Sequence, residues 1–138
     1  MDSLDRPAKA DVSLRVPADG AYVSVLRTMT AGLAARLDFT VDDIEDLRIA
    51  VGEACALVLP EAVADADLVA DFRLTPGVLA ISVSVPTAGP RTADPDSFAW
   101  QVLSTLTSSA GATGDETHFE VTFTTESSVP VAQPGAGG

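Results

Sequence analysis

The sequence contains only one cysteine and one histidine, so it has few of the side chains that form disulfides or bind metal ions. Cys55 has no second cysteine for an intramolecular disulfide and no neighbours at the spacing of metal ligands. Its place on the apolar stripe of a helix favours a small core residue over a reactive thiol. His118 stands at an outward position of an expected strand, which favours a plain surface residue over a base or ligand. We therefore expect neither a disulfide framework nor a metal centre.

Basic residues are also scarce, with 8 lysines and arginines against 20 aspartates and glutamates, for a formal net charge of −12. A field of this sign repels the phosphate backbone of nucleic acids and anionic membrane surfaces. A basic surface on a protein partner would be attracted, and the association would be faster at low salt. The charge balance therefore excludes direct nucleic-acid binding and favours a protein partner.

Long hydrophobic runs are absent as well. No stretch approaches the roughly 18 apolar residues of a membrane span, and the opening MDSLDRPAKAD lacks the apolar segment of a signal peptide. With 138 residues, 46% of them hydrophobic, the chain can bury the core of one domain. These features predict a soluble protein of the cytoplasm with one folded unit.

The two ends of the chain differ in composition from the rest. Residues 1–10 are polar, and residues 126–138 (ESSVPVAQPGAGG) are rich in proline, glycine, alanine and serine. Such segments bury too little apolar surface to offset the entropy of ordering them. We expect a mobile N-terminus over 1–10, a folded domain over 11–125 and a disordered tail over 126–138.

Between the ends, apolar residues alternate between a period of two and a period of 3.6, which predicts the order β-α-α-β-β-α-β. The expected elements are strands at 11–16, 67–74, 78–85 and 117–124, and helices at 21–37, 41–58 and 94–107. A turn at 75–77 (TPG) joins the second and third strands into a hairpin. Asp94 and Pro95 are expected to start the last helix, whose apolar stripe begins at Phe98.

The first two helices carry clear stripes. The apolar positions of the first recur at three- and four-residue steps and are Tyr22, Val25, Leu26, Met29, Leu33 and Leu37. The expected core stripe of the second is Ile44, Leu47, Val51, Cys55 and Val58. Glu53 falls on nearly the opposite face of that helix, on the same side as Ile49, Ala56 and Leu57.

Acidic residues crowd the start of the second helix. Thr40 has the form of an N-cap three residues before Asp43. The cluster consists of Asp42, Asp43, Glu45 and Asp46. Carboxylates at this end complement the helix dipole, which is their simplest explanation, and binding of a partner is the sharper alternative.

Two stretches resemble a known family. The run LRTMTAGLAARLDFTVDDIEDLRIAVGEACALVL at 26–59, followed by strands and then DPDSFAWQVLSTL at 94–106, is similar to the anti-sigma-factor serine kinases of the GHKL ATPase superfamily, of the RsbW type. The resemblance implies an α/β (α+β) two-layer sandwich of the Bergerat type, with helices on one face of a mixed sheet. It also implies a homodimer that holds an alternative sigma factor inactive. A competing anti-anti-sigma protein of the STAS type releases the sigma factor and is itself inactivated by ATP-dependent serine phosphorylation.

The nucleotide site that the resemblance implies is eroded in this chain. Glu53 matches the acid of the family's first box and would be a vestigial general base. Leu57 replaces the asparagine that helps to hold Mg²⁺ in the family, and a leucine side chain has no oxygen ligand. The loop of the second box keeps Gly89 without the family's aspartate, and the glycines of the third box align with Ser97 and Ala99. At about 1–3 kcal/mol for each lost contact, ATP binding with Mg²⁺ is expected to be weak.

The resemblance also implies a partner surface. Arg27 stands where the family's first helix has an arginine that contacts both the sigma factor and its competitor, although a surface arginine would look the same in the sequence. Trp100 lies either on the nucleotide side of the last helix or, as the alternative, in the core or at a dimer contact. We interpret the chain as a partner-switching anti-sigma factor with a degenerate kinase site. The alternatives are a divergent serine kinase that uses Glu53 as base, and a GHKL-like dimeric scaffold of another regulator.

Overall fold

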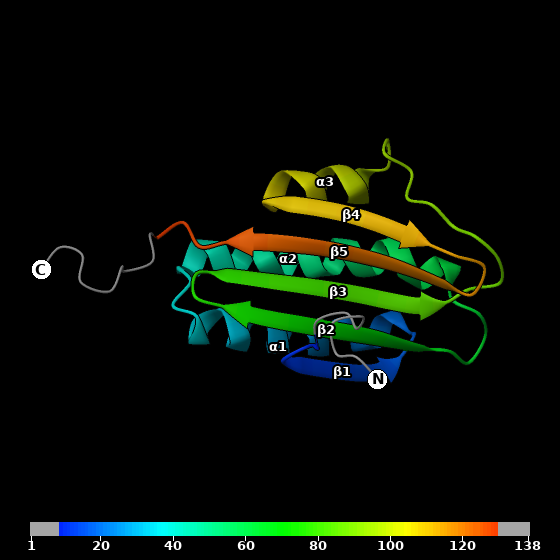
Figure 1. Ribbon diagram of the computed structural model, residues 1–138, viewed down its shortest axis with the longest axis horizontal. Helices are drawn as coiled ribbons and strands as arrows, with labels where there is room; N and C mark the ends of the chain where they lie inside the picture. The colour runs from blue at the N-terminus through cyan, green and yellow to red at the C-terminus, as the bar shows by residue number, and fades with distance from the viewer. Residues whose placement is uncertain (1–8, 130–138) are drawn as a thin grey trace, which may run out of the picture.

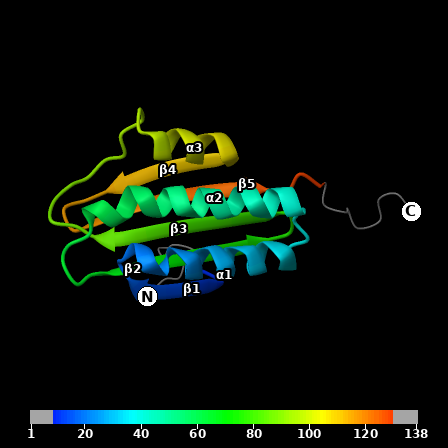
Figure 2. The ribbon, with the colours of Figure 1, turned by 180° about the vertical axis from the view of Figure 1, so that it is seen from behind.

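A computed structural model describes residues 9–129 of the chain as a five-stranded sheet with all of the α-helices on one face (Figures 1 and 2). The strands are β1 (Val12–Pro17), β2 (Asp67–Thr75), β3 (Val78–Pro86), β4 (Ser109–Gly114) and β5 (His118–Glu126). The helices are α1 (Val23–Arg36), α2 (Val41–Val58) and α3 (Phe98–Leu106), with short 3-10 turns η2 (Gly20–Tyr22) and η3 (Leu59–Glu61). The segments 1–8 and 130–138, which hold most of the two ends expected to be mobile, lie outside the described residues.

The sheet has the order β1-β2-β3-β5-β4, and all four pairings of neighbouring strands are antiparallel. The expectation of two layers with helices on one face is confirmed, and the expectation of a mixed sheet was wrong. β3 and β4 do run in the same direction, but β5 lies between them. The tight turn from β4 to β5 forces those two strands to be antiparallel, so no parallel neighbours remain.

β4 is an element that the sequence prediction missed. Its residues, SAGATG, contain none of the bulky β-branched or aromatic side chains that mark strands except one threonine. Pairing with β5 over its whole length makes this segment a strand. Its position therefore depends on a partner strand and not on local preference.

The core lies between the sheet and α2. Inward side chains of β2, β3 and β5, among them Phe72, Ile81 and Phe123, belong to the same buried core as the inner side chains of this helix. The expected α2 stripe is confirmed except at Ile44, which is half-buried, and Ala50 and Ala54 widen it. Cys55 is fully buried, as expected of a core residue.

The start of α3 differs from the prediction. Its N-cap is Ser97, and Phe98 at the first helical position has 77% of its surface exposed. The residues DPDS instead form a turn, in which the Ser97 amide donates to the Asp94 carbonyl at 3.0 Å. Proline suits the second position of such a turn as well as it suits the first turn of a helix, so the sequence could not separate the two.

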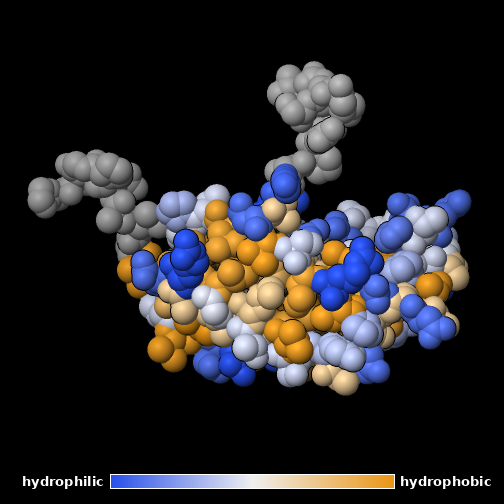
Figure 3. Space-filling view, turned by 90° about the horizontal axis from the view of Figure 1, so that it is seen from below, coloured by the Kyte–Doolittle hydropathy of each residue, from blue (hydrophilic) through white to orange (hydrophobic). Residues whose placement is uncertain are grey.

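The edge formed by β1 and α1 carries apolar side chains between polar patches (Figure 3). Tyr22 and Val25, expected on the buried stripe of the first helix, are 39% and 44% exposed. The expectation was wrong at these positions because α1 lies at one edge of the helical layer, and its inner side packs on α2 (Figure 2).

Candidate functional site

The site that the resemblance implies is centred on α2, on the side that faces α3. Ile49 lines a hollow together with α3 residues, and Glu53 follows one helical turn later on the same side. Glu53 is half-buried, and no hydrogen bond engages its carboxylate within residues 9–129. Leu57, a further turn along, is half-buried and packs against the hydrophobic core. One helical turn after the Glu53 carboxylate, the helix therefore presents the hydrocarbon side chain of Leu57 and no oxygen ligand for a metal ion.

The hollow between α2 and α3 is apolar in character. It has a volume of about 370 Å³ and is lined by Ile49, Phe98, Gln101, Val102, Thr105 and Leu106. None of these side chains carries a charge, and hydrocarbon cannot replace the hydration of a triphosphate. Trp100, on the same helix, packs against the hydrophobic core, which agrees with the structural role expected for it and not with the nucleotide-side role.

Two backbone hydrogen bonds fix the first residues of the loop that follows β3. The Thr87 amide donates to the Thr117 carbonyl at 2.8 Å, and the Gly89 amide donates to the Glu116 carbonyl at 3.1 Å. Gly89 has a φ of +116°, a conformation that favours glycine. Its amide is therefore engaged by the turn between β4 and β5 and is not directed at a ligand.

Farther along, Arg91 fastens the same loop on two sides. Its Nε lies 2.6 Å from Oε1 of Glu61 in η3. Its carbonyl oxygen also lies where a side chain at Gly114 would begin, so only glycine fits at the end of β4. The loop is thus held between η3, which follows α2, and the hairpin formed by β4 and β5.

The start of α3 is already capped from within the chain. The Ser97 hydroxyl accepts a hydrogen bond from the Trp100 amide at 3.2 Å, which satisfies one of the free amides that a phosphate would use. Ala99 is half-buried in the first turn. Asp94 and Asp96 precede the helix, and their carboxylates would repel an anion there. The structure thus places Ser97 and Ala99 together, with Gly89 engaged separately at the last hairpin.

Arg27 reaches α2 at Gly52, one residue before Glu53 and about 100° around the helix from it. It extends from α1 across Gly52 of α2, and both residues are half-buried. Burial raises the pKa of the Cys55 thiol to about 11, and the positive charge of Arg27 lowers it in part. Sequence reasoning did not single out Gly52. A glycine inside a helix costs about 1 kcal/mol relative to alanine, and this cost was the available signal.

The acidic cluster at the start of α2 divides into two groups. Thr40 caps the helix as expected and accepts from the Asp43 amide at 3.1 Å. The Asp43 carboxylate accepts from the Ser128 amide at 3.0 Å and the Ser128 hydroxyl at 2.8 Å, so it joins the segment after β5 to α2. Burial acts to raise the pKa of Asp43, but hydrogen bonds from Ser128 and Thr40 outweigh it and hold the pKa below 3.8. Asp42, Glu45 and Asp46 remain exposed.

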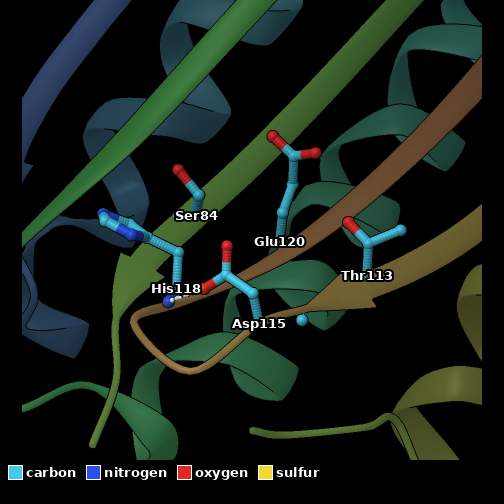
Figure 4. Close-up of a pocket in the computed structure, with 6 residues that line it drawn as sticks. Ser84, Thr113, Asp115, His118 and Glu120 are labelled. Atoms are coloured by element: carbon cyan, nitrogen blue, oxygen red, sulfur yellow. Dashed lines mark hydrogen bonds between the residues drawn. The ribbon is translucent and has the colours of Figure 1, made fainter. Parts of the chain in front are cut away.

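A second hollow, of about 380 Å³, lies on the sheet face that carries no helix (Figure 4). Its side chains rise from β3, β4, β5 and the last turn, and the lining residues are Ser84, Thr113, Gly114, Asp115, His118 and Glu120. Most of its polar groups are engaged locally. Asp115 Oδ1 accepts from the amides of Thr117 and His118 at 2.7 and 2.8 Å, which lowers the pKa of Asp115. Glu120 accepts from the Ser82 hydroxyl at 2.7 Å.

The bonds to Asp115 stabilise the β4–β5 turn, and the bond from Ser82 to Glu120 joins β3 to β5. The Thr117 hydroxyl lies 3.0 Å from His118 Nδ1 and 3.0 Å from Asp115 Oδ1 within the same exposed turn. His118 is exposed, as expected of a surface residue. Within residues 9–129, no three histidine, cysteine or acidic side chains group in a way that could hold a metal ion. In the same part of the chain, no helix combines the length and apolar character needed to cross a membrane.

No family model matches this chain. It is 43% identical over 54 residues to a protein named serine-protein kinase RsbW from Bacillus velezensis, which covers 39% of this chain and 34% of that protein. A protein of the same name from Bacillus thuringiensis is 41% identical over 51 residues, which covers 37% of this chain and 32% of that protein. The matched segment thus spans about a third of the length of these relatives.

Among solved structures, the chain resembles the crystal structure of the RsbU and RsbW domains of Rv1364c from Mycobacterium tuberculosis. The TM-score is 0.63 at 17% sequence identity, and the match covers 87% of this chain and 34% of that chain. At this identity the likeness carries the fold alone. The RsbW-like α/β fold is therefore confirmed, and the curated relatives confirm the resemblance to RsbW that the sequence motifs indicated.

Proposed function

We propose that this chain is an anti-sigma factor of a partner-switching system. It sequesters an alternative sigma factor and is relieved by an anti-anti-sigma protein of the STAS type that competes for it. The similarity to proteins named serine-protein kinase RsbW supports this proposal. Its setting is the cytoplasm, where such partners meet, and its active form is a homodimer.

We propose further that the chain has no efficient kinase activity. The observation that carries this part is the pair formed by Glu53 and Leu57. A magnesium ion requires oxygen ligands, and the turn after the carboxylate presents a leucine that packs against the core. The amide of Gly89 and the capped start of α3 remove two further groups that a nucleotide would use. The residues present therefore do not fit Mg-ATP in the manner of the family.

Calorimetry with Mg-ATP tests the loss of the nucleotide site. We expect no dissociation constant tighter than roughly 100 μM, because three lost polar contacts remove roughly 3–9 kcal/mol of binding free energy. A low-micromolar dissociation constant would overturn the proposal of a degenerate site.

Capture from a native lysate tests the partner. The chain is used as bait, and a sigma factor identified by mass spectrometry is then purified and titrated against it. We expect the two purified proteins to form a complex, and we expect an anti-anti-sigma protein to dissociate it. Failure of a purified sigma factor to bind would leave the third interpretation, a dimeric scaffold of another regulator, in its place. Light scattering on the purified chain tests the homodimer.

A divergent serine kinase is the second candidate, and one observation favours it. Glu53 is half-buried with no hydrogen bond to its carboxylate within the described residues, so it is free to accept a proton from a substrate hydroxyl. Incubation of the chain and its antagonist with Mg-ATP, for wild type and Glu53→Gln, separates the two candidates. Phosphate transfer by wild type and not by the variant would establish the kinase.

A further inference from the structure

Exposed apolar side chains gather between α2 and α3, which lie side by side on the helical face (Figure 2). Phe98 at the start of α3 has 77% of its surface exposed, and Ile49 of α2 has 48%. Both line the hollow of about 370 Å³ between these helices, which the half-buried Val102 and Leu106 also line. This hollow and the residues that line it form an open apolar strip, which we call the α2/α3 groove.

Acidic side chains border the α2/α3 groove. Asp46 precedes Ile49 by three residues and Glu53 follows it by four, so all three share one side of α2. Within residues 9–129, neither of these two carboxylates has an ion pair or a hydrogen bond. The sequence of α3, FAWQVLSTL, contains no charged residue, and Asp94 and Asp96 precede it. The groove therefore combines hydrocarbon with negative charge that is not neutralised.

The basic residue of α2 lies on a different side of the helix. Arg48 precedes Ile49 by one residue, so it lies about 100° around α2 from it. The exposed Glu45 precedes Arg48 by three residues and shares the side of Arg48. An opposite charge thus already lies beside Arg48, whereas the side of α2 toward the groove carries acidic residues and no basic one.

We propose that the α2/α3 groove is a docking site for an amphipathic helix of a protein partner, with apolar residues on one side and lysine or arginine along the edge. Apolar residues at steps of three and four cover Ile49 and Phe98, and a basic residue pairs with Glu53 or Asp46. This contact is separate from the arginines of α1. It goes beyond the proposed sequestration of a sigma factor and does not depend on it.

Charge and size determine the kind of occupant. The net charge of −12 repels acidic helices and anionic lipid surfaces and attracts a basic helix. The nine residues of α3 rise by about 12 Å, so the groove contacts roughly two turns of the occupant. Such a contact buries less than the approximately 1,200 Å² of a stable interface. We therefore expect binding in the micromolar range that forms and dissociates readily.

Synthetic peptides test the chemistry of the occupant. The first, of roughly 14 residues, or four helical turns, carries leucines at steps of three and four with lysines on both sides of that stripe. The second has glutamates in place of the lysines, and the third is the first in scrambled order. At physiological ionic strength the first should bind at least about tenfold more tightly than either of the others. In NMR titrations the signals of Phe98 and Val102 should shift most. Equal binding of the first and scrambled peptides would overturn the groove.

The exposed apolar residues allow a test that leaves the fold intact. Phe98→Ser should weaken binding of the first peptide by about tenfold, because one large apolar contact is lost. Ile49→Ser should weaken it several-fold. Val25→Ser is the matched control, since Val25 is 44% exposed on α1, and its effect should be less than about twofold. Circular dichroism checks that each variant is folded. Equal effects of all three changes would place the peptide elsewhere and overturn the proposal.

Two matched changes of charge test the acidic border. Glu53→Gln should weaken binding of the first peptide several-fold, because a pair with lysine is lost. Glu45→Gln, on the side of Arg48, should leave binding unchanged. Equal effects would indicate general attraction by net charge and would overturn the role of the border.

Dilution of the chain alone tests a second copy as the occupant. We expect the Phe98 and Val102 signals to be independent of concentration. Signals that move with concentration in wild type and not in Phe98→Ser would assign the groove to self-association and overturn the proposal. Because no sigma factor enters these experiments, failure of the proposed function and failure of the groove are distinguishable.

Discussion

The two longest helices lie side by side on the sheet and differ sharply in charge (Figure 2). α1 carries two arginines and no acidic residue, whereas α2 carries five acidic residues and one arginine. Four of these acids gather at the start of α2, and Glu53 lies farther along. Its single arginine, Arg48, follows Glu45 by three residues, so these two opposite charges share one side of the helix. A partner that approaches the helical face therefore meets one basic helix beside one acidic helix, although the chain as a whole is strongly acidic.

The helices also differ in what they give to the fold. α2 buries six residues and holds the core of the sheet, while α1 buries three and leaves its outer edge apolar and exposed (Figure 3). A change at a polar side chain of α1 outside the buried core, such as the half-buried Arg27, can therefore alter binding with little effect on folding. A change on α2 acts first on stability. Four variants test this division.

Reversal of the charge of α1 has the largest expected effect. Arg27→Glu removes the donor fork and places an anion against the partner's carboxylate, so binding to the sigma factor should weaken by roughly 2–5 kcal/mol if the pair is buried. Circular dichroism should report an intact fold. Titration against the purified sigma factor measures the loss. Full affinity in a folded variant would remove Arg27 from the interface, and Glu45→Lys would then test the exposed acids of α2.

Restoration of the family's amide in α2 should act on stability. Leu57→Asn places an amide where a leucine packs against the core, and we expect a loss of about 1–3 kcal/mol in the free energy of unfolding. Urea denaturation measures the change, and Ala56→Asn at the exposed neighbouring position is the control. An unchanged stability together with newly gained ATP binding would mean that the site is open and can be rebuilt.

The acidic start of α2 depends on its cap. Thr40→Ala removes the hydroxyl that accepts from the Asp43 amide, and the free energy of unfolding should fall by about 0.5–2 kcal/mol. Thermal denaturation of this variant and of Thr28→Ala, an exposed threonine in α1, separates the cap from a general effect of alanine. A melting temperature equal to that of wild type would show that the acidic residues alone hold this end.

The smallest effect is expected from the link between α2 and the segment after β5. The pKa of Asp43 is lowered in the folded chain, so the stability that its bonds to Ser128 contribute is complete above the ordinary carboxyl pKa of 3.8 and is lost as the pH falls through the lowered value. The Ser128 amide signal, followed by NMR during acidification, should shift in that range. In Asp43→Asn the shift should disappear. A shift that persists in the variant would assign it to another group.

Much of the candidate site could be placed from the sequence alone. Glu53 and Leu57 were put on one face of α2 by helical spacing, and the structure keeps them there. Gly89 and Ser97 could only be aligned by motif, and what each group does depends on distant bonds. The Gly89 amide is engaged by the Glu116 carbonyl, and the Ser97 hydroxyl caps α3 because the turn that begins at Asp94 ends at Ser97. No local pattern contains either fact.

The sequence by itself determined the two long helices, the cap at Thr40, the hairpin of β2 and β3, and the missing oxygen at Leu57, because these follow from periodicity and from bonds between near neighbours. The tertiary structure alone decided the strand β4, the all-antiparallel order, the bonds from Ser128 to Asp43 and the close approach of Arg27 to Gly52. Each of these joins segments far apart in the chain. Such contacts are selected by the free energy of the whole packed fold, and composition or spacing within one segment carries no record of them.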